Sequence, residues 1–492
     1  MDSPDAFSPE LFRAQAHAVA DQLADYLARA TRRAPMPVLP PDTADALVEH
    51  WSDRFPASAA PDPVAALTTL LDDVIAHSNH LHHPHYVGHQ VTSPLPQSAV
   101  TEFFSALLNN VMAVYEMGPV STAMERSLIR WLGTQCGFDR IRADGVLTSG
   151  GSAGNLTALL AARQERAGFD AWHGGHTAGP PLAILAGESA HYSVKRAVQI
   201  MGWGHDGLIP VPVDSRFKLR PECLEEALDE GRRRGRKVIA VAAGACSTAT
   251  GAFDPLEPIA EFCSRQGLWL HVDGAHGAVA ALAPKYRHLV AGIQHADSVV
   301  WDTHKMMLMP APATAVIFRN GASSAHAFAQ QASYLFTGTV PENEWYNVGQ
   351  RTIECTKRQM SLQLYAALVV RGTQFFADYV TQMFDLGHTF GDMISADPDF
   401  ELPVRPECNI VCFRYRPRAA KSAVAVAPAQ LDALNAAIRR HILHSGSFYL
   451  VQTQLPTGLH LRVTLINPLT TQDDLAELLT AARHAAAILM QA

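Results

Sequence analysis

The chain has 492 residues, a length that predicts roughly two to three domains. Apolar residues make up 48% and charged residues 17% of the composition, so the chain can bury a large core and extensive disorder is excluded. The formal charge of −8 argues against a general nucleic-acid-binding protein, because such proteins present a net basic surface.

The 7 cysteines are scattered and form no C-x-x-C pair. This pattern disfavours a disulfide scaffold and a zinc–thiolate site, and it fits a reducing compartment. No apolar run approaches the roughly 18–20 residues that a membrane span needs. The first residues, Met1–Asp5, are polar and acidic, unlike a secretory signal. We therefore expect a cytoplasmic protein that does not enter a membrane.

Residues 1–100 are expected to form a helical N-terminal arm. Ser8 is a capping residue with Pro9 at the first helical position, and a second helical pattern runs from Pro63 to His77. The proline-rich connector 34–41 between them cannot be helical. A few helices bury little surface alone, so we expect the arm to pack on another part of the assembly, with a second subunit as a candidate.

Residues 101–375 alternate short apolar runs with helical patterns, which predicts a mostly parallel, seven-stranded, doubly wound α/β sheet. Sheets of this kind bind ligands at the carboxyl ends of their strands. The expected strands are Gly145–Ser149, Leu182–Ala186, Leu208–Val213, Val238–Ala243, Leu268–Val272, Ser298–Trp301 and Thr314–Phe318.

Residues 376–492 are expected to form a small α+β C-terminal domain, entered by a helical stretch from Ser361 to Met393. Overlapping capping boxes at Thr470–Asp474 introduce a last helix. Before them lie three strand-like runs and one helix, namely Asn409–Tyr415, Ser447–Thr453, Leu459–Leu465 and Leu431–Leu443.

Lysine is rare in this chain, and Lys305 follows a strand of the buried type. A lysine in such a place loses solvation of its ammonium form, which predicts a lowered pKa and a nucleophilic amine. The alternative is a lysine at the edge of the core whose head group reaches solvent.

Asp273 ends another apolar strand and is followed by the small residues Gly274 and Ala275. A carboxylate at this position can pair with a cationic ring nitrogen, and the small residues leave room for a flat ligand. The alternative is an aspartate that caps a turn.

The glycine-rich segment Thr148–Asn155 lies between a strand and a helix. Its glycines and the helix N-terminus suit a phosphate cradle. The same residues also read G-x-S-x-G, so Ser152 is a candidate serine-hydrolase nucleophile. The HGG run His173–Gly175 lies downstream of the serine instead of upstream, which counts against the hydrolase.

His191 stands at a strand-to-helix junction. It can stack on a ring or cap the helix, and capping is the more common role for such a residue taken alone.

Taken together, the cradle, the histidine, the aspartate and the lysine occur in an order that resembles the fold-type I pyridoxal-phosphate enzymes. The chain resembles most specifically the group II amino-acid decarboxylases. The resemblance runs from about residue 80 to the C-terminus and rests on H-V-D-x-A-x-G (271–277), A-P-K-Y-R-H-L-V-A-G-I-Q-x-A-D-S (283–298) and D-x-H-K (302–305).

The resemblance implies that Lys305 holds pyridoxal 5'-phosphate as a Schiff base and that Asp273 keeps the ring nitrogen protonated. It further implies that the cofactor ring stacks on His191 with one face and packs against Ala275 with the other. The remaining cofactor residues that it implies are Gly151, Ser152, Thr248, Asp302 and His304, with the role of Asp302 the least secure, since an ionised carboxylate cannot donate to a phosphate. The family often has G-T-T where this chain has Cys246-Ser247-Thr248.

The loop-like segment Phe336–Tyr346 falls near the mobile-loop tyrosine of similar decarboxylases. By that resemblance Tyr346 returns a proton to Cα of the substrate, and loop closure excludes water and oxygen. Related aldehyde synthases carry an apolar residue there. The alternative for Tyr346 is an aromatic side chain that packs a loop.

The family equivalent of His85–Ser93 lines the substrate pocket, and here it is polar at His89, Gln90 and Ser93. This composition favours a polar or acidic amino-acid substrate. The histidine-rich run His77–His89 offers no cysteine pair or carboxylate that would complete a four-ligand metal site, so we expect no metal there.

The sequence therefore predicts a decarboxylase that converts an L-amino acid to the amine and carbon dioxide. By resemblance it is expected to be a homodimer with its active site at the subunit interface, without nucleic-acid or membrane partners. The alternatives are an aldehyde synthase with the same cofactor, a serine hydrolase that uses Ser152, and a catalytically silent relative.

Overall fold

The computed structural model describes residues 5–328, 344–417 and 427–491. The chain divides into two compact units. The larger unit comprises residues 90–388 and 404–411, and the smaller unit comprises residues 1–89, 389–403 and 412–492. The N-terminal helices thus group with C-terminal segments, whereas the expected three-part division at residues 100 and 375 stays a prediction.

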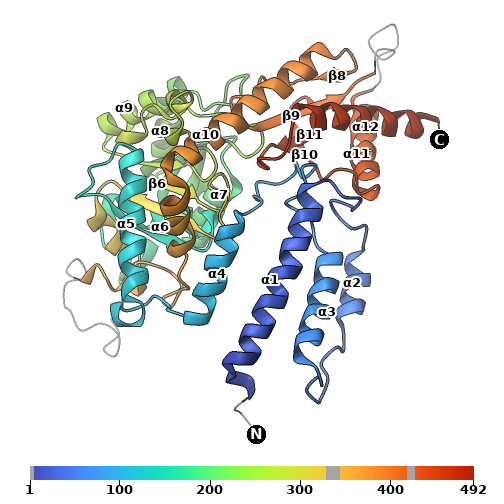
Figure 1. Ribbon diagram of the computed structural model, residues 1–492. Helices are drawn as coiled ribbons and strands as arrows, with labels where there is room; N and C mark the ends of the chain where they lie inside the picture. Colours follow the sequence, from blue (N-terminus) through green and yellow to red (C-terminus); the bar gives the residue numbers. More distant parts are fainter. Residues whose placement is uncertain (1–4, 329–343, 418–426, 492) are drawn as a thin grey trace. The chain divides into compact units, whose positions relative to one another are not determined.

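The larger unit is built on a seven-stranded sheet in the order β1-β7-β6-β5-β4-β2-β3. Strands β2 to β6 pair in parallel where they adjoin, and β7 runs antiparallel to both β6 and β1. Each strand overlaps one expected from the sequence, so the mostly parallel sheet is confirmed (Figure 1). The strands are β1 Asp144–Thr148, β2 Leu182–Gly187, β3 Leu208–Val211, β4 Lys237–Gly244, β5 Trp269–Asp273, β6 Ser298–Asp302 and β7 Thr314–Phe318.

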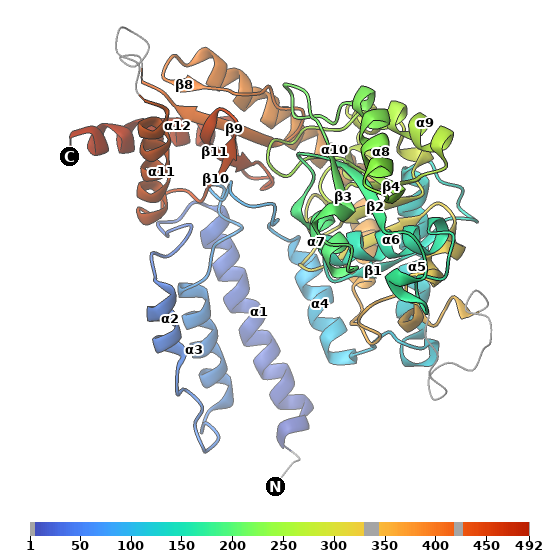
Figure 2. The ribbon, with the colours of Figure 1, turned by 180° about the vertical axis from the view of Figure 1, so that it is seen from behind.

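Helices cover both faces of this sheet, as expected for a doubly wound fold (Figure 2). Helices α6 (Gly151–Arg166) and α7 (Tyr192–Ile200) pack on one face, where their apolar residues share a core with Val316 and Phe318. Helix α5 (Pro119–Gln135) packs on the other face, where Gly133 lies against Ile317. Further helices of this unit are α4 Pro96–Leu108, α8 Leu224–Arg233 and α9 Leu256–Gln266.

The long helical segment α10 covers Ser361–Ala396 and is interrupted at Gly372. The backbone there has φ 75° and ψ 167°, a left-handed conformation that favours glycine and breaks the helical ladder. The single helix expected from the sequence is therefore two helices joined at this residue.

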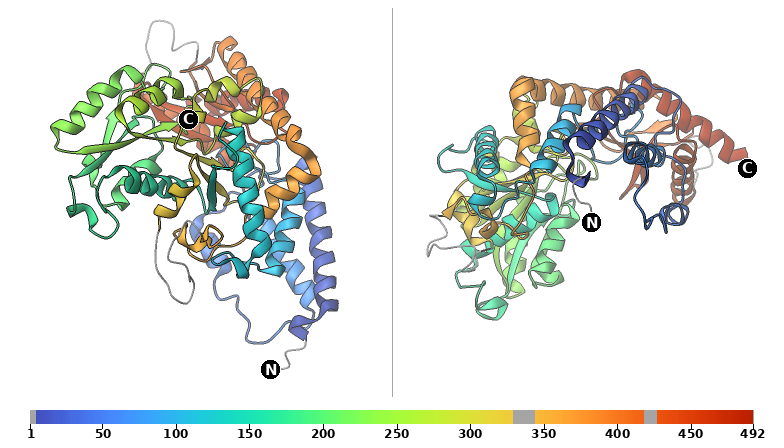
Figure 3. Two further views of the ribbon diagram at one scale, coloured as in Figure 1. Left: turned by 90° about the vertical axis from the view of Figure 1, so that its left-hand side faces the viewer. Right: turned by 60° about the horizontal axis from the view of Figure 1, so that its bottom comes forward.

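The smaller unit combines the N-terminal helices with a four-stranded sheet in the order β10-β11-β9-β8. Helices α1 and α3 run side by side, as Figure 3 shows. Ser8 caps α1 by accepting a hydrogen bond from the N–H of Leu11, as expected. The elements are α1 Pro9–Thr31, α2 Ala44–Trp51, α3 Pro63–Ala76, β8 Phe400–Glu401, β9 Ile410–Tyr415, α11 Pro428–His444, β10 Val451–Leu455, β11 Gly458–Thr464 and α12 Gln472–Gln491.

The expected capping box at the last helix is present at Thr471 and Asp474. The N–H of Thr471 donates to Asp474 Oδ2 at 2.7 Å, and the N–H of Asp474 donates to Thr471 Oγ1 at 3.3 Å. Across the described parts of the chain, no helix is both long enough and apolar enough to cross a bilayer.

Candidate active site

A cavity of about 170 Å³ opens at the carboxyl edge of the seven-stranded sheet. Loops that follow β1, β2, β4, β5 and β6 line it, as the parallel fold requires. The structure brings together all of the cofactor-site residues expected from the sequence, namely Gly151, Ser152, His191, Thr248, Asp273, Ala275, Asp302, His304 and Lys305.

Lys305 lies just beyond β6, and its Nζ is 2.9 Å from Asp302 Oδ2. Burial acts to lower the pKa of Lys305, but the Asp302 carboxylate and the nearby Asp273 outweigh it, so the pKa is raised. The lowered pKa expected from the sequence was therefore wrong. The carboxylate that reverses the direction of the shift belongs to Asp302, three residues upstream.

Asp273 ends β5 and is held by Asn155, which donates from Nδ2 to Asp273 Oδ2 at 2.8 Å. Asn155 Oδ1 in turn lies 2.9 Å from His271 Nε2, and His271 Nδ1 lies 2.9 Å from Ser298 Oγ. Trp269 Nε1 donates to the same serine oxygen at 2.9 Å. The serine hydroxyl then has its proton left for His271 Nδ1, so His271 Nε2 carries the ring proton and donates to Asn155.

Burial lowers the pKa of His271 to about 4, so its ring is neutral at physiological pH. A neutral ring has one donor and one acceptor, which is what Asn155 and Ser298 require. The series of hydrogen bonds behind Asp273 is thus uncharged, and each of its donors faces an acceptor. It therefore fixes the orientation of the Asp273 carboxylate.

Of the two roles that the sequence left open for His191, the structure shows the cap, and stacking on a ring stays a prediction. His191 is the N-cap of α7, where its Nδ1 accepts from the N–H of Ser193, and it also lines the cavity. Its Nδ1 lies 2.7 Å from Ser193 Oγ, which accepts a hydrogen bond from Asn155 Nδ2 at 2.8 Å. Ser193 therefore donates its hydroxyl proton to Nδ1 and leaves Nε2 as the protonated nitrogen. Burial lowers the pKa of His191, which favours this neutral form.

The glycine-rich turn has the backbone geometry of an anion cradle. Gly150 has φ 132°, a conformation that L side chains rarely adopt, and α6 begins at the next residue. A Cβ atom on Gly151 would lie 3.2 Å from Asp302 Oδ2, so a side chain would crowd the cavity. The first N–H groups of α6 point out of the helix end, where they can bind a phosphate.

Asp302 and His304 surround Lys305 on the loop after β6. Asp302 Oδ1 accepts from Thr314 Oγ1 at 2.6 Å, and its other oxygen pairs with Lys305. His304 Nδ1 lies 2.9 Å from the carbonyl oxygen and 3.2 Å from the amide nitrogen of Ala313. Asp302 is thus the counter-ion of Lys305, and its proposed place near the phosphate stays a prediction.

Sequence reasoning gave no role to three residues that line the cavity, namely Asn155, Cys246 and His276. Asn155 stood within the glycine-rich motif, but its bonds to Ser193, His271 and Asp273 depend on contacts across the sheet. His276 Nε2 donates to Asn409 Oδ1 at 2.9 Å, a partner 133 residues away. No local sequence signal gives such pairings.

Tyr346 does not line this cavity. Its ring lies edge-on to Tyr115, with the ring centroids 5.7 Å apart. The preceding part of the expected loop, residues 336–343, lies outside the described residues. The role of Tyr346 as a proton donor therefore stays a prediction.

The expected substrate residues fall in both units. Gln90 and Ser93 belong to the larger unit but do not line the cavity, whereas His89 belongs to the smaller unit. Partial burial lowers the pKa of His89, and the nearby cations Arg462 and Arg439 lower it further.

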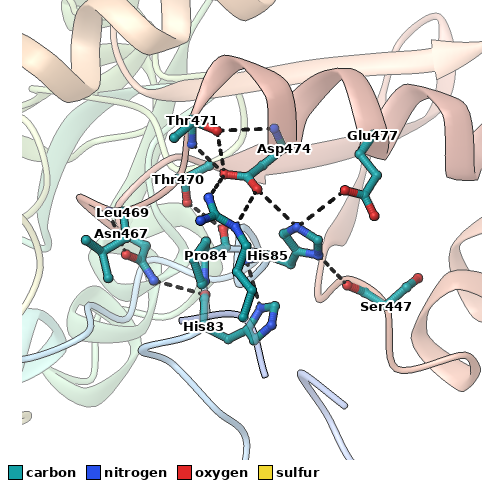
Figure 4. A network of polar contacts seen from close by, with 11 residues as sticks. His83, Pro84, His85, Ser447, Asn467, Leu469, Thr470, Thr471, Asp474 and Glu477 are labelled. Carbon is teal, nitrogen blue, oxygen red and sulfur yellow. Dashed lines mark hydrogen bonds and ion pairs between the residues drawn. The ribbon is translucent and has the colours of Figure 1, made fainter. Parts of the chain in front are cut away.

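His85, at the start of the same segment, is tied into a polar network of the smaller unit (Figure 4). Its Nδ1 is 3.0 Å from the carbonyl oxygen of Ser447, and its Nε2 is 3.2 Å from Asp474 Oδ1. The ring also stacks on Phe448 at a centroid distance of 3.9 Å. These contacts anchor the segment that precedes His89.

Of the histidine-rich run, His77 joins a group of possible metal ligands with His50 and Asp73, the one such group within the described residues. The guanidinium of Arg54 already occupies this group, with Nη1 2.6 Å from Asp73 Oδ2 and Nη2 3.2 Å from His50 Nδ1. A cation would have to displace that side chain.

The cavity suits pyridoxal phosphate by the chemistry of its donors. Lys305 offers an amine for the aldehyde, Asp273 a fixed carboxylate for the ring nitrogen, and the start of α6 N–H donors for the phosphate. His191 and Ala275, a planar and a small side chain, line the same cavity.

The comparisons with known proteins agree with this chemistry. Residues 53–416 match the model of the pyridoxal-dependent decarboxylase conserved domain. The chain is 33% identical over 349 residues to cysteine sulfinic acid decarboxylase of Rattus norvegicus, covering 70% of this chain and 69% of that protein. It is 27% identical over 436 residues to aromatic-L-amino-acid decarboxylase of Bacillus atrophaeus, covering 89% and 88%.

The crystal structure of mouse CSAD superposes with a TM-score of 0.90 at 26% identity, covering 97% of this chain and 99% of that chain. The family model matches most of the chain, and the fold agrees over nearly its full length. Both findings favour the decarboxylase family over the serine-hydrolase alternative. The chain belongs to the pyridoxal-dependent decarboxylase family, and it catalyses pyridoxal-phosphate-dependent amino-acid decarboxylation.

Proposed function

We propose that this decarboxylase acts on an acidic L-amino acid and releases the corresponding amine and carbon dioxide. The observation that carries the proposal is the positive charge around His89, where Arg439 and Arg462 both act on the ring. The family resemblance assigns the segment that contains His89 to the substrate pocket, and a second carboxylate or a sulfinate on a substrate bound there would be attracted by these cations. The similarity to a cysteine sulfinic acid decarboxylase supports this choice, although an aromatic amino-acid decarboxylase is also similar.

The residue roles are proposed from the geometry of the cavity. Pyridoxal phosphate supplies an aldehyde that bonds to amines and a ring that accepts the electron pair left when carbon dioxide departs. Lys305 Nζ would hold the aldehyde carbon, and Asp302, 2.9 Å away, would take the proton that this amine must lose. Asp273 would keep a proton on the ring nitrogen, because Asn155 fixes its carboxylate in place.

His191 would press on the ring face and use Nε2–H toward the substrate, since Ser193 engages its Nδ1. Gly151 and Ser152 would hold the phosphate, with His304 and Thr248 beside them. Tyr346 is retained as the candidate proton donor to Cα. An aldehyde synthase with the same site would consume oxygen and release peroxide, so oxygen consumption separates the two reactions.

We also propose that the enzyme is a homodimer with its active site at the subunit interface. The support is an apolar surface on α4, where large side chains are more than half exposed. A protein surface that carries such a patch is usually covered by a partner. The residues of this surface are Val100, Phe103, Phe104, Leu107 and Leu108.

Substrate preference is tested by steady-state turnover on aspartate, glutamate, cysteine sulfinate, diaminobutyrate, tyrosine and tryptophan. We expect kcat/KM to be highest for an acidic member of this panel. We expect Arg439→Gln to lower kcat/KM for that substrate by about tenfold, because it removes one of the cations near His89.

The matched control is Arg440→Gln, which removes a neighbouring but exposed cation of the same helix. Equal effects of the two variants, or a preference of the wild-type enzyme for tyrosine or tryptophan, would reject an acidic substrate.

A further inference from the structure

The strand that leads into the phosphate cradle lies at one edge of the sheet. In the strand order β1 follows β7 and ends the row, so its outer edge faces no strand of this sheet. Backbone groups on such an edge need other partners, because an unpaired buried N–H or C=O is costly.

An ion pair supplies partners for this edge at Leu147. The N–H of Leu147 donates to Glu125 Oε1 at 3.0 Å, and the carbonyl oxygen of Leu147 accepts from Lys357 Nζ at 2.7 Å. Lys357 Nζ also donates to Glu125 Oε1. Glu125 and Lys357 thus bond to the strand as a neighbouring strand would.

Both charges of this pair are buried, with 2% of Glu125 and 5% of Lys357 exposed. Burial lowers the pKa of Lys357, and the Glu125 carboxylate acts in the opposite direction. The main chain of Lys357 is fixed as well, since it exchanges two hydrogen bonds with Met112, at 2.7 and 3.0 Å. The lysine therefore has little freedom to leave the strand.

The segment that carries Lys357 makes a second contact two residues beyond Leu147. Ser149 Oγ donates to Glu354 Oε1 at 2.7 Å. The next residue is Gly150, whose left-handed φ starts the turn, and Gly151 and Ser152 follow at the cavity. Two consecutive anchors therefore precede the cradle, and neither touches the cavity itself.

We propose that Glu125, Glu354 and Lys357 are positioning residues that hold the cradle at Gly150–Ser152 in register for the phosphate group of the cofactor. Rigid support of this kind matters because N–H donors bind an anion well only when they are pre-aligned with it. The inference rests on the proposed phosphate role of Gly151 and Ser152.

The opposite end of the same strand provides a matched control. Asp144 begins β1, is 6% exposed, and lies 3.4 Å from Arg126 Nε and 3.6 Å from Arg351 Nη1. Asp144→Asn therefore disturbs a buried ion pair of the same strand, but at the edge of the sheet remote from the cavity. It reports the cost of disturbing β1 without disturbing the cradle.

The test compares pyridoxal phosphate with pyridoxal, which has the same aldehyde and ring but no phosphate. Dissociation constants of both probes are measured by absorbance for full-length wild type, Lys357→Met and Asp144→Asn, together with the unfolding midpoint of each. We expect Lys357→Met to raise the dissociation constant of pyridoxal phosphate by at least about tenfold and that of pyridoxal by less than about twofold. Asp144→Asn is expected to leave both dissociation constants unchanged, even if it lowers the unfolding midpoint as much as Lys357→Met does.

Equal weakening of the two probes by Lys357→Met would show a general structural role and overturn the proposal. Lys357→Arg retains the charge and is expected to recover most of the preference for the phosphorylated probe. If Lys357→Met does not fold, Glu354→Gln carries the same prediction, because it removes the charge from the acceptor of the Ser149 anchor.

Ser152→Ala, measured in parallel, separates this inference from the cradle on which it rests. A reduced preference for pyridoxal phosphate in Ser152→Ala but not in Lys357→Met would overturn the positioning role alone. An unchanged preference in both variants would overturn the cradle as well.

Discussion

Two histidines, one buried and one partly exposed, lie in polar networks that differ in charge. His271, behind Asp273 in the larger unit, bonds to a serine hydroxyl and an amide oxygen, and its neutral ring satisfies both. His85, in the smaller unit, faces acceptors at both nitrogens, the carbonyl oxygen of Ser447 and the carboxylate of Asp474 (Figure 4). The Arg33 guanidinium pairs with the same carboxylate at 2.8 Å, so this network contains an ion pair.

The difference shows what each network can do. The uncharged chain through His271 gives each group one allowed orientation, which suits a site where a carboxylate must point at one atom of a ring. The charged network joins Arg33, His85 and Asp474 and ties the N-terminal segment to the start of α12. It links segments of the smaller unit, whereas the hydrogen bonds behind Asp273 orient side chains that line the cavity.

The largest expected effect comes from breaking the uncharged chain at its centre. Asn155→Leu keeps the volume of the side chain but removes the hydrogen bonds to Asp273, Ser193 and His271. We expect kcat to fall on the order of 10- to 100-fold, because both Asp273 and His191 lose their orientation. Steady-state kinetics measure this loss, and the absorbance spectrum of the bound cofactor should shift with it. A variant with wild-type kcat and an unchanged spectrum would contradict the positioning role of Asn155.

Breaking the charged network should instead affect stability alone. Asp474→Asn weakens the pairing with Arg33 and His85 and the capping box of Thr471. We expect the free energy of unfolding to fall by about 2 kcal/mol while kcat stays within about twofold of wild type. Urea unfolding and steady-state kinetics on the same preparation test both statements. A large loss of kcat in folded Asp474→Asn would remove the contrast between the networks.

Acid is expected to destabilise the folded protein by protonating His271 in the uncharged hydrogen-bond network. Its pKa is about 4 in the folded protein against an ordinary value of 6.5. Between these two pH values the unfolded chain therefore binds a proton at His271 that the folded protein does not bind. Stability from this group is therefore complete above about pH 7 and is lost as the pH falls from 6.5 toward 4. The expected loss is about 2 kcal/mol at pH 5, which His271→Gln should abolish.

The measurement is the free energy of unfolding of wild type and His271→Gln between pH 5 and pH 7.5. Burial also lowers the pKa of His83 in the smaller unit to about 4, so some acid sensitivity will remain in the variant. Identical pH profiles for the two proteins would show that His271 is not held neutral by the fold.

Much of the fold and of the site could be predicted from local sequence. Every strand of the larger sheet overlaps a short apolar run. Except for the edge strand β3, where Pro210 is exposed, these strands are buried along nearly all of their length, so their apolar residues are contiguous. The family resemblance could name residues that the structure brings to one cavity, because they lie in short motifs at or just after the ends of strands. The capping box at Thr471 likewise needs only residues three apart.

What could not be predicted depends on partners distant in sequence or on competing terms of similar size. The pKa of Lys305 was predicted to fall because its burial was evident, while the opposing effect of Asp302 was not weighed. Glu125 and Lys357 are 232 residues apart, and nothing local marks either as a buried pair. The break of α10 at Gly372 was missed because a glycine inside a helical pattern does not by itself end a helix.

The central claim is that the amine of Lys305 bonds the aldehyde of the cofactor in the cavity at the carboxyl edge of the sheet. Reduction of the purified, active enzyme with borohydride, followed by proteolysis and mass spectrometry, tests it directly. The account predicts a pyridoxyl group on the peptide that contains Lys305, and none on that peptide in Lys305→Ala. Active enzyme in which Lys305 stays unmodified, with the label on another lysine, would contradict the account.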